Sequence, residues 1–239
     1  MTTAFVAGAT GYTGREVVRQ LVERGVRAVA HVRPDSPRLA EWRERFAELG
    51  AEVDATPWEE PAMRASLARW RPAQLFALLG TTRERGRRTE ESGGGGGAVP
   101  DTYESVDYGL TSLLIRAASS SGVRPRFVYL SAAGVRDGAT NPYLAARARA
   151  ERELRESGLP FIIARPSFIT GPDREERRPM ERAAAAAGDA LLAVAGALGA
   201  SGLRARYHST TASQLAAALV RLALDPMTED TVVEGEGLR

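Results

Sequence analysis

Short apolar runs alternate with longer amphipathic stretches along the chain. The apolar runs predict strands at residues 4–7, 26–32, 51–54, 73–79, 126–131, 161–164 and 231–233. Apolar positions three and four residues apart predict helices at residues 15–24, 38–49, 61–70, 101–121, 143–157, 183–200 and 212–224. Strands that alternate with helices are typical of a doubly wound parallel sheet, so we expect a single α/β domain.

Two segments interrupt this alternation. Residues 83–100 are charged and then contain five consecutive glycines, Gly93 to Gly97, which predicts a flexible loop. A mobile lid and an inert insertion are both compatible with that loop. Residues 183–200 are mostly alanine and glycine but carry Asp189. This composition favours a packed helix, or one that faces a second copy of the chain in a homo-oligomer, over a membrane span.

Composition narrows the chemistry. The chain has 239 residues and no cysteine, which excludes disulfides, thiolate metal sites and cysteine nucleophiles. Its only histidines are His31 and His208, so we expect no metal site. The net charge of +2 is too small to indicate a nucleic-acid partner. The first residues lack a secretory pattern, and together with the missing cysteines this predicts a cytoplasmic protein.

A glycine-rich turn follows the first predicted strand. Gly8, Gly11 and Gly14 are spaced every third residue and lead into a helix. In such a turn one glycine permits a sharp bend, a second lets the backbone approach a pyrophosphate, and a third lets helix and strand pack closely. The amides at the start of the helix then hold the anion. We therefore expect residues 1–239 to form a Rossmann-like domain that binds a dinucleotide, with residues 171–239 as a small portion on the substrate side.

The second predicted strand ends at Arg33, where a dinucleotide site meets the adenosine ribose. An acid there suits the 2′-hydroxyl of NAD, and an arginine suits the 2′-phosphate of NADP. Asp35 has the spacing of an NAD acid, but it follows Pro34 and has left the strand. Arg33, with Arg38 nearby, is the better partner because its planar fork matches a phosphate, although an ordinary solvated arginine is the competing interpretation. The sequence therefore favours NADP(H) over NAD(H).

Further polar residues follow other predicted strands. Asp54 ends the third strand, where it could contact adenine or be a plain surface acid. Ser131 ends the fifth strand, and Tyr143 begins the next helix with Arg147 four positions later, on the same face. A fixed cation beside a phenol favours the phenolate, and a neighbouring serine can hold a substrate carbonyl while tyrosine transfers the proton. On its own this pattern is weak in a chain so rich in arginine.

Several segments together resemble the atypical short-chain dehydrogenase/reductase superfamily, over residues 4 to about 224. They are Gly8-Ala9-Thr10-Gly11-Tyr12-Thr13-Gly14, Val106-Asp107-Tyr108, Phe127-Val128-Tyr129-Leu130-Ser131, Tyr143-Leu144-x-x-Arg147 and Arg165-Pro166-Ser167. Three more are similar to the Tat-interactive-protein oxidoreductases and to NmrA-like proteins. These are Leu79-Gly80-Thr81-Thr82-Arg83, Tyr143-Leu144 with Glu151, and Asp173-Arg174-Glu175-Glu176-Arg177-Arg178-Pro179.

The resemblance implies a role for each matching residue. Ser131, Tyr143 and Arg147 would be the catalytic trio, with Tyr143 and Arg147 also near the cofactor. Gly8, Thr10, Gly11, Tyr12, Thr13 and Gly14 would line the pyrophosphate. Arg33 would meet the 2′-phosphate, Leu79 and Gly80 would flank the adenine ribose, and Pro166 would face the nicotinamide amide.

The chain departs from this family at two positions. The family has lysine where this chain has Arg147, and that lysine binds the nicotinamide ribose. Arginine keeps the charge but has a wider planar head. The chain contains no lysine, and all 32 basic residues are arginine, which indicates compositional drift, such as that of a GC-rich bacterial genome. The family also often has two serines where this chain has Ser131-Ala132.

The sequence supports two functions of different classes. The leading hypothesis is an NADPH-dependent oxidoreductase that transfers hydride to or from a small carbonyl or alcohol, with Tyr143 as acid–base. The alternative is a cofactor-binding sensor that reports the NADP(H) state to a protein partner without turnover. A nucleotide-sugar epimerase or dehydratase is disfavoured because little chain follows Arg165 to build a sugar-nucleotide domain.

Overall fold

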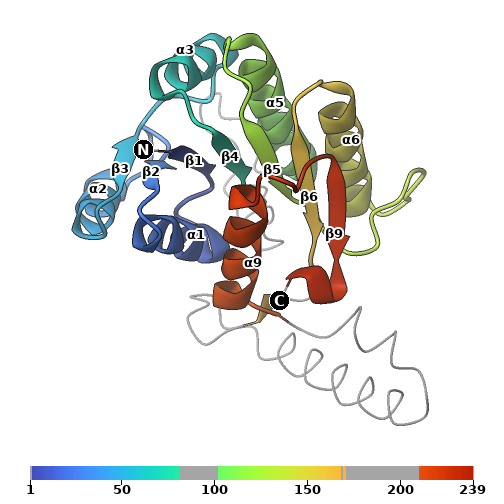
Figure 1. Ribbon diagram of the computed structural model, residues 1–239. Coiled ribbons are helices and arrows are strands. Elements are labelled where there is room, and N and C mark those ends of the chain that lie inside the picture. Colours follow the sequence, from blue (N-terminus) through green and yellow to red (C-terminus); the bar gives the residue numbers. More distant parts are fainter. Residues whose placement is uncertain (1, 81–101, 168, 171–209, 239) are drawn as a thin grey trace.

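A seven-stranded parallel sheet forms the centre of the molecule (Figure 1). The computed structural model describes residues 2–80, 102–167, 169–170 and 210–238. The strands, in the spatial order β3-β2-β1-β4-β5-β6-β9, all pair in parallel. They are β1 (Thr3–Ala7), β2 (Arg27–His31), β3 (Glu52–Asp54), β4 (Gln74–Ala77), β5 (Arg126–Leu130), β6 (Phe161–Arg165) and β9 (Thr231–Glu234). The prediction of a doubly wound parallel sheet is confirmed.

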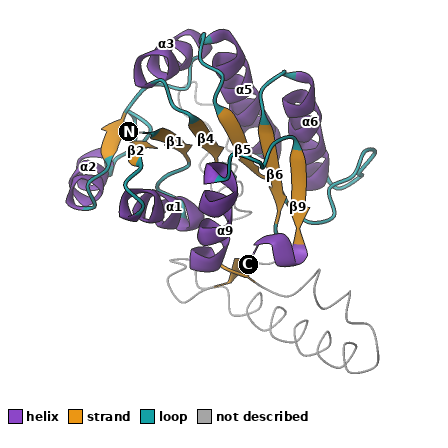
Figure 2. Ribbon diagram, viewed as in Figure 1, coloured by secondary structure: helices purple, strands orange, loops and turns teal. Residues whose placement is uncertain are grey.

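Helices cover both faces of the sheet (Figure 2). One face carries α1 (Tyr12–Glu23), α2 (Leu39–Glu48) and α9 (Ala212–Leu224). The other carries α3 (Glu60–Trp70), α5 (Thr111–Ser120) and α6 (Pro142–Glu156). Side chains of a strand alternate between these two cores: in β1, Ala4 and Val6 pack against the α1 side, and Phe5 and Ala7 against the α3 side. Because both faces are covered, the strands are continuous apolar runs.

The strand order reverses between β1 and β4. From β1 the chain proceeds outward through β2 and β3, and then returns to place β4 on the other side of β1. The loops that leave the carboxyl ends of β1 and β4 therefore diverge, which opens a crevice at that edge of the sheet. In open α/β sheets, ligands bind in this crevice.

Two parts of the fold differ from the sequence prediction. The stretch expected as one helix at residues 101–121 is a π-helix, η1 (Tyr103–Leu110), continued by α5. A small parallel pair, β7 (Ile169–Thr170) with β8 (Thr210–Thr211), was not predicted at all. The glycine run and the alanine-rich helix expected at residues 183–200 lie outside the described residues.

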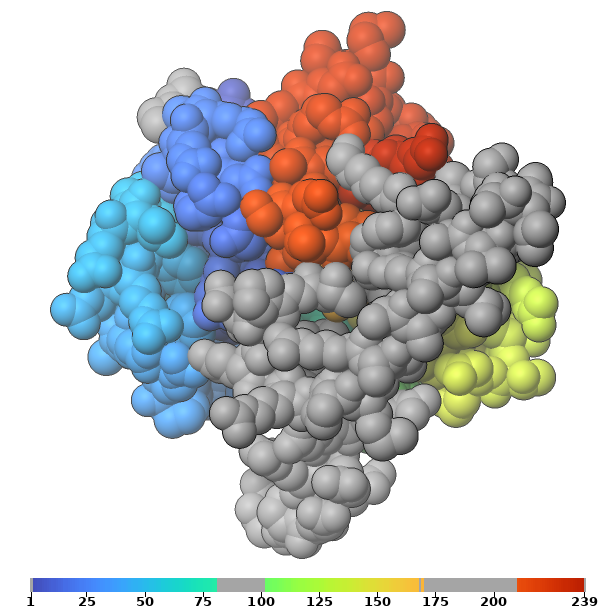
Figure 3. Space-filling model, turned by 90° about the horizontal axis from the view of Figure 1, so that it is seen from below, coloured from blue at the N-terminus to red at the C-terminus, as the bar shows by residue number. Residues whose placement is uncertain are grey.

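The described end of the chain is built into the main sheet. β9 pairs with β6, and a short 3₁₀-helix, η2 (Gly235–Leu238), follows it. α9 packs against α1, and Figure 3 shows the two helices side by side in blue and orange-red. Within the part of the chain that the structure describes, no helix has the length and apolar character needed to cross a membrane.

Candidate functional site

The turn after β1 is shaped by glycines that cannot be replaced without a clash. Gly8 has a φ of +83°, and a Cβ there would lie 2.5 Å from the carbonyl oxygen of Leu78, at the end of β4. A Cβ on Gly14 would overlap the carbonyl oxygen of Gly8. Gly11 caps α1 in an extended conformation. The absence of side chains thus lets α1 begin directly behind the turn.

The start of α1 is suited to an anion. A helix leaves its first amide groups without intrahelical acceptors, and its dipole makes that end positive. No acidic side chain lies in the first turn of α1, which contains Tyr12, Thr13 and Gly14. Phosphate groups bind at helix ends of this kind. The local structure therefore agrees with the expected pyrophosphate site.

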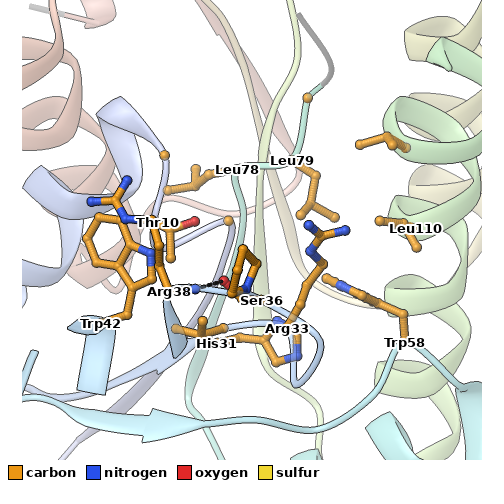
Figure 4. Close-up of a pocket in the computed structure, with 16 residues that line it drawn as sticks. Thr10, His31, Arg33, Ser36, Arg38, Trp42, Trp58, Leu78, Leu79 and Leu110 are labelled. Atoms are coloured by element: carbon orange, nitrogen blue, oxygen red, sulfur yellow. Dashed lines mark hydrogen bonds between the residues drawn. The ribbon is translucent and has the colours of Figure 1, made fainter. Parts of the chain in front are cut away.

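A pocket of about 350 Å³ opens beside this turn (Figure 4). Among its lining residues are these predicted cofactor residues: Gly8, Thr10, Gly11, Arg33, Arg38, Leu79 and Gly80. Six further lining residues were not predicted to contact the cofactor: His31, Ser36, Trp42, Trp58, Val106 and Leu110. They come from three separate stretches of the chain, and no local motif marks them as neighbours.

The two arginines of the pocket point in different directions (Figure 4). Arg38 turns toward Trp42, with its guanidinium 5.0 Å from the ring centroid, and donates to Glu41 at 2.7 and 2.9 Å. Arg33 instead extends toward Trp58. Its Nε lies 3.8 Å from Asp35 in a pair of exposed side chains, which is a weak interaction. Arg33 is therefore more available to a ligand anion than Arg38.

Four residues that line the pocket, His31, Trp58, Val106 and Leu110, form a wall without charged side chains. The ring of His31 meets the ring of Trp58 edge-on, with 4.7 Å between centroids, and His31 Nε2 lies 2.8 Å from the carbonyl oxygen of Thr56. Burial lowers the pKa of His31, which favours the neutral imidazole. Val106 and Leu110 add apolar surface to the same pocket. This combination suits a flat heterocycle such as a purine base.

Asp54 lies inside the protein rather than on the pocket wall. Its side chain is fully buried and accepts hydrogen bonds from the Thr56 amide, Ser66 Oγ, Arg69 Nη2 and Trp70 Nε1 at 2.7 to 3.0 Å. Burial raises the pKa of Asp54, but these hydrogen bonds outweigh it and hold the pKa below the usual value. The expected contact with adenine does not fit this position, because the bonds from Ser66, Arg69 and Trp70 tie β3 to α3 instead.

Ser131 is also committed to a protein partner. Its hydroxyl donates to Glu151 Oε1 at 2.6 Å, and Arg165 binds both carboxylate oxygens of Glu151 at 2.9 and 2.6 Å. Burial raises the pKa of Glu151, but the hydrogen bonds from Arg165 and Ser131 lower that pKa by more than burial raises it, so the carboxylate stays charged. A hydroxyl has a single proton, so Ser131 must turn away from Glu151 before it can donate to a substrate carbonyl.

Arg147 is buried among acceptors of the protein itself. Its Nη2 donates to Asp107 Oδ1 at 2.6 Å and to the carbonyl oxygen of Leu79 at 2.9 Å. Its Nη1 donates to the carbonyl oxygen of Leu130 and, at 3.4 Å, to the hydroxyl of Tyr129. Burial raises the pKa of that hydroxyl to about 12. The ribose contact expected at this position does not fit an arginine whose Nη groups are all engaged.

Tyr143 is the most accessible of the three predicted catalytic residues. It follows Pro142 in the first turn of α6, and Asn141 caps the helix by accepting from the Tyr143 amide at 3.0 Å. The half-buried Tyr143 ring lies 5.3 Å from the guanidinium carbon of Arg147 and 5.3 Å from the ring of Tyr103. Pro166, expected near the nicotinamide, is buried just after β6.

Comparison with known proteins identifies the family. A sequence profile described as NAD(P)H-binding matches residues 8–195. The chain belongs to this NAD(P)H-binding family. It is a Rossmann protein of the atypical short-chain dehydrogenase/reductase group. Among curated proteins, it is 26% identical to the mitochondrial protein fmp52-1 of Aspergillus terreus, over 77% of this chain and 73% of that protein.

Solved structures share the fold of this NAD(P)H-binding protein. The UDP-Glc/GlcNAc 4-epimerase of Campylobacter jejuni has a TM-score of 0.66 at 15% identity, covering 97% of this chain and 77% of the epimerase. The triphenylmethane reductase of Citrobacter sp., solved with NADP(H), has a TM-score of 0.61 at 16% identity, covering 99% of this chain and 70% of the reductase. These likenesses concern the fold alone.

The residues of the crevice fit the cofactor of the family. A side chain at Gly8 or Gly14 would close the turn, so that the backbone itself can approach a diphosphate. The pocket beside it offers cationic side chains at Arg33 and Arg38 and an uncharged wall at Trp58. An NAD(P)H molecule is able to use all three features.

We expect Asp54→Asn to lower the free energy of unfolding by about 3 kcal/mol, because bonds to a charged acceptor are lost and donors are left opposing the new amide. Urea unfolding measures this. Asp35→Asn is the control: its side chain is 74% exposed, so the change should stay below about 0.5 kcal/mol. A loss of NADPH affinity at unchanged stability would instead assign Asp54 to the cofactor.

Proposed function

We propose that this protein is an NADPH-dependent oxidoreductase that acts on a small carbonyl or alcohol. The observation that carries the proposal is the position of Tyr143. Its ring lies against the buried cation of Arg147, and the same guanidinium holds the carbonyl oxygen of Leu79, a residue of the pocket wall. Arg147 therefore stands between Tyr143, the proposed proton-transferring group, and the wall of the dinucleotide pocket. This arrangement lies at the carboxyl edge of the sheet, where open α/β sheets bind ligands.

In this proposal, different residues of the chain bind the cofactor and transfer the proton. The turn from Gly8 to Gly14 binds the diphosphate through backbone amides. Tyr143 holds the proton that a carbonyl oxygen takes up on reduction, and Arg147 keeps positive charge beside that phenol. The bound cofactor supplies the hydride.

The preference for NADPH over NADH is part of the proposal. Arg33, Ser36 and Arg38 gather in the turn between β2 and α2, where the 2′-position of the adenosine ribose is read. Arg33 offers a half-exposed guanidinium, which can bind a phosphate through two parallel hydrogen bonds. The nearby Asp35 is not among the residues that line the pocket, so it is poorly placed to accept from a ribose hydroxyl.

A second candidate is a sensor that binds NADP(H) without turnover. Two observations favour it. The Ser131 hydroxyl already donates its hydrogen bond to Glu151, and both Nη groups of Arg147 donate to acceptors of the protein. Such a site would bind the dinucleotide but would leave Tyr143 without the serine hydroxyl that helps to hold a substrate carbonyl. The protein partner of a sensor would then read the state of the cofactor.

We expect Arg33→Ala to weaken NADPH binding about tenfold and to leave NADH binding unchanged, because one charge-assisted phosphate contact is lost. Calorimetry with both nucleotides measures the two affinities. Arg43→Ala, an exposed arginine of α2 outside the pocket, should change neither. An unchanged ratio of the two affinities in Arg33→Ala would show that Arg33 does not read the 2′-phosphate.

We expect Tyr143→Phe to reduce NADPH oxidation on a panel of carbonyl compounds at least about 100-fold, the contribution of a general acid. Binding of NADPH should stay within about twofold, because the ring keeps its contacts with Arg147 and Tyr103. Tyr103→Phe is the matched control and should retain most of the turnover. Tight NADPH binding by the wild type with no turnover on any carbonyl would favour the sensor.

A further inference from the structure

Arg147 and Asp107 form an ion pair that is closed off from solvent. Their side chains are 5% and 0% exposed, and Arg147 Nη2 lies 2.6 Å from Asp107 Oδ1. The pair joins α6 to the π-helix η1. Because both charges are buried, each depends on the other: removal of one leaves an uncompensated charge in the interior.

The pair lies between two walls of the dinucleotide pocket. On one side, Val106, the neighbour of Asp107 in η1, lines the pocket. On the other side, Arg147 Nη2 donates to the carbonyl oxygen of Leu79, and both Leu79 and Gly80 line the pocket after β4. One guanidinium thus connects the end of a strand to the helix that faces it across the pocket rim.

Gly80 provides an independent observation. Among the described residues it is not one of the glycines with a positive φ, so its backbone does not require glycine. A Cβ at this position would lie 2.9 Å from Arg147 Nη2 and 3.6 Å from Asp107 Oδ1. The first distance is too short for a real contact, and the guanidinium cannot retreat because it is tied to acceptors on three elements. The space for a side chain is therefore occupied by the cation.

We propose that Asp107 and Arg147 are positioning residues for the dinucleotide. Their ion pair braces the rim between β4 and η1, fixes the shape of the pocket and requires glycine at position 80. The pair acts on the bound nucleotide through Leu79, Gly80 and Val106, without touching it. The effect on nucleotide affinity rests on the proposed NADP(H) site, whereas the coupling between Gly80 and Arg147 can be measured from stability alone.

Arginine suits this brace better than lysine. Each Nη of Arg147 carries two hydrogens and meets two acceptors: Asp107 and Leu79 on Nη2, Leu130 and Tyr129 on Nη1. A lysine has three donors on one atom and cannot reach four acceptors arranged around a planar fork. The arginine at this position thus has a structural use that a lysine would not fulfil.

The test is a double-mutant cycle between Gly80→Ala and Arg147→Lys. In the wild-type background we expect Gly80→Ala to raise the Kd for NADPH about tenfold and to lower the Tm by about 4 °C. In the Arg147→Lys background the same change should raise the Kd less than about threefold and lower the Tm by about 1 °C, because the obstructing Nη2 is gone. Equal effects in both backgrounds would overturn the proposal.

Asp107→Asn separates positioning from simple stability. It should lower the Tm by about 8 °C and raise the Kd for NADPH at least about fivefold, measured well below the Tm. Asp54→Asn is the matched control, since it removes a buried carboxylate at the edge strand β3, outside the pocket lining, and should destabilise without weakening binding. Glu60→Gln, in an exposed pair with Arg116, should change neither quantity.

The outcomes distinguish this proposal from the proposed function. If Asp107→Asn and Asp54→Asn weaken NADPH binding equally, or neither weakens it, Asp107 is not a positioning residue. If the wild type binds no NADPH, the proposed function fails, whereas the Tm cycle still decides whether Gly80 and Arg147 are coupled.

Discussion

The close contact between Gly14 and the carbonyl oxygen of Gly8 is the constraint on which the site depends. It places the start of α1 directly behind the turn that leaves β1, so that the positive end of the helix faces the crevice. The crevice exists because β4 lies on the opposite side of β1 from β2. Local backbone packing and strand order therefore act together: the first supplies the amides, and the second supplies the room in front of them.

Buried charge near the ends of these strands is neutralised by arginine in each case. Asp54, Asp107 and Glu151 are carboxylates in the interior, and each accepts hydrogen bonds from a guanidinium. A buried ion pair adds little stability by itself, but its geometry is specific, because a missing partner is costly. The planar guanidinium of arginine can donate to several acceptors at once. In this chain, which contains no lysine, arginine side chains connect loops and helices to the ends of strands.

Much of the fold could be predicted because its signals are local. A strand buried on both faces is a continuous apolar run, as at residues 73–79, and a glycine that caps a sharp turn is visible in the sequence itself. The π-helix before α5 could not be predicted, because its apolar positions resemble those of an ordinary helix. Trp58 and His31 were missed for another reason: they become neighbours only when β2 and the loop after β3 are brought together.

The same distinction explains why cofactor binding is better founded than catalysis. The glycine turn is defined by its own backbone, whereas the roles of Ser131 and Arg147 depend on Glu151 and Asp107, which lie 20 and 40 residues away. These long-range partners take up the donors that a resemblance alone would assign to substrate or ribose. Arginine at position 147 preserves the positive charge beside Tyr143 but turns its hydrogen bonds inward. In the function proposed here, the buried cation supports the pocket from behind, and the phenol of Tyr143 is the group left to transfer the proton.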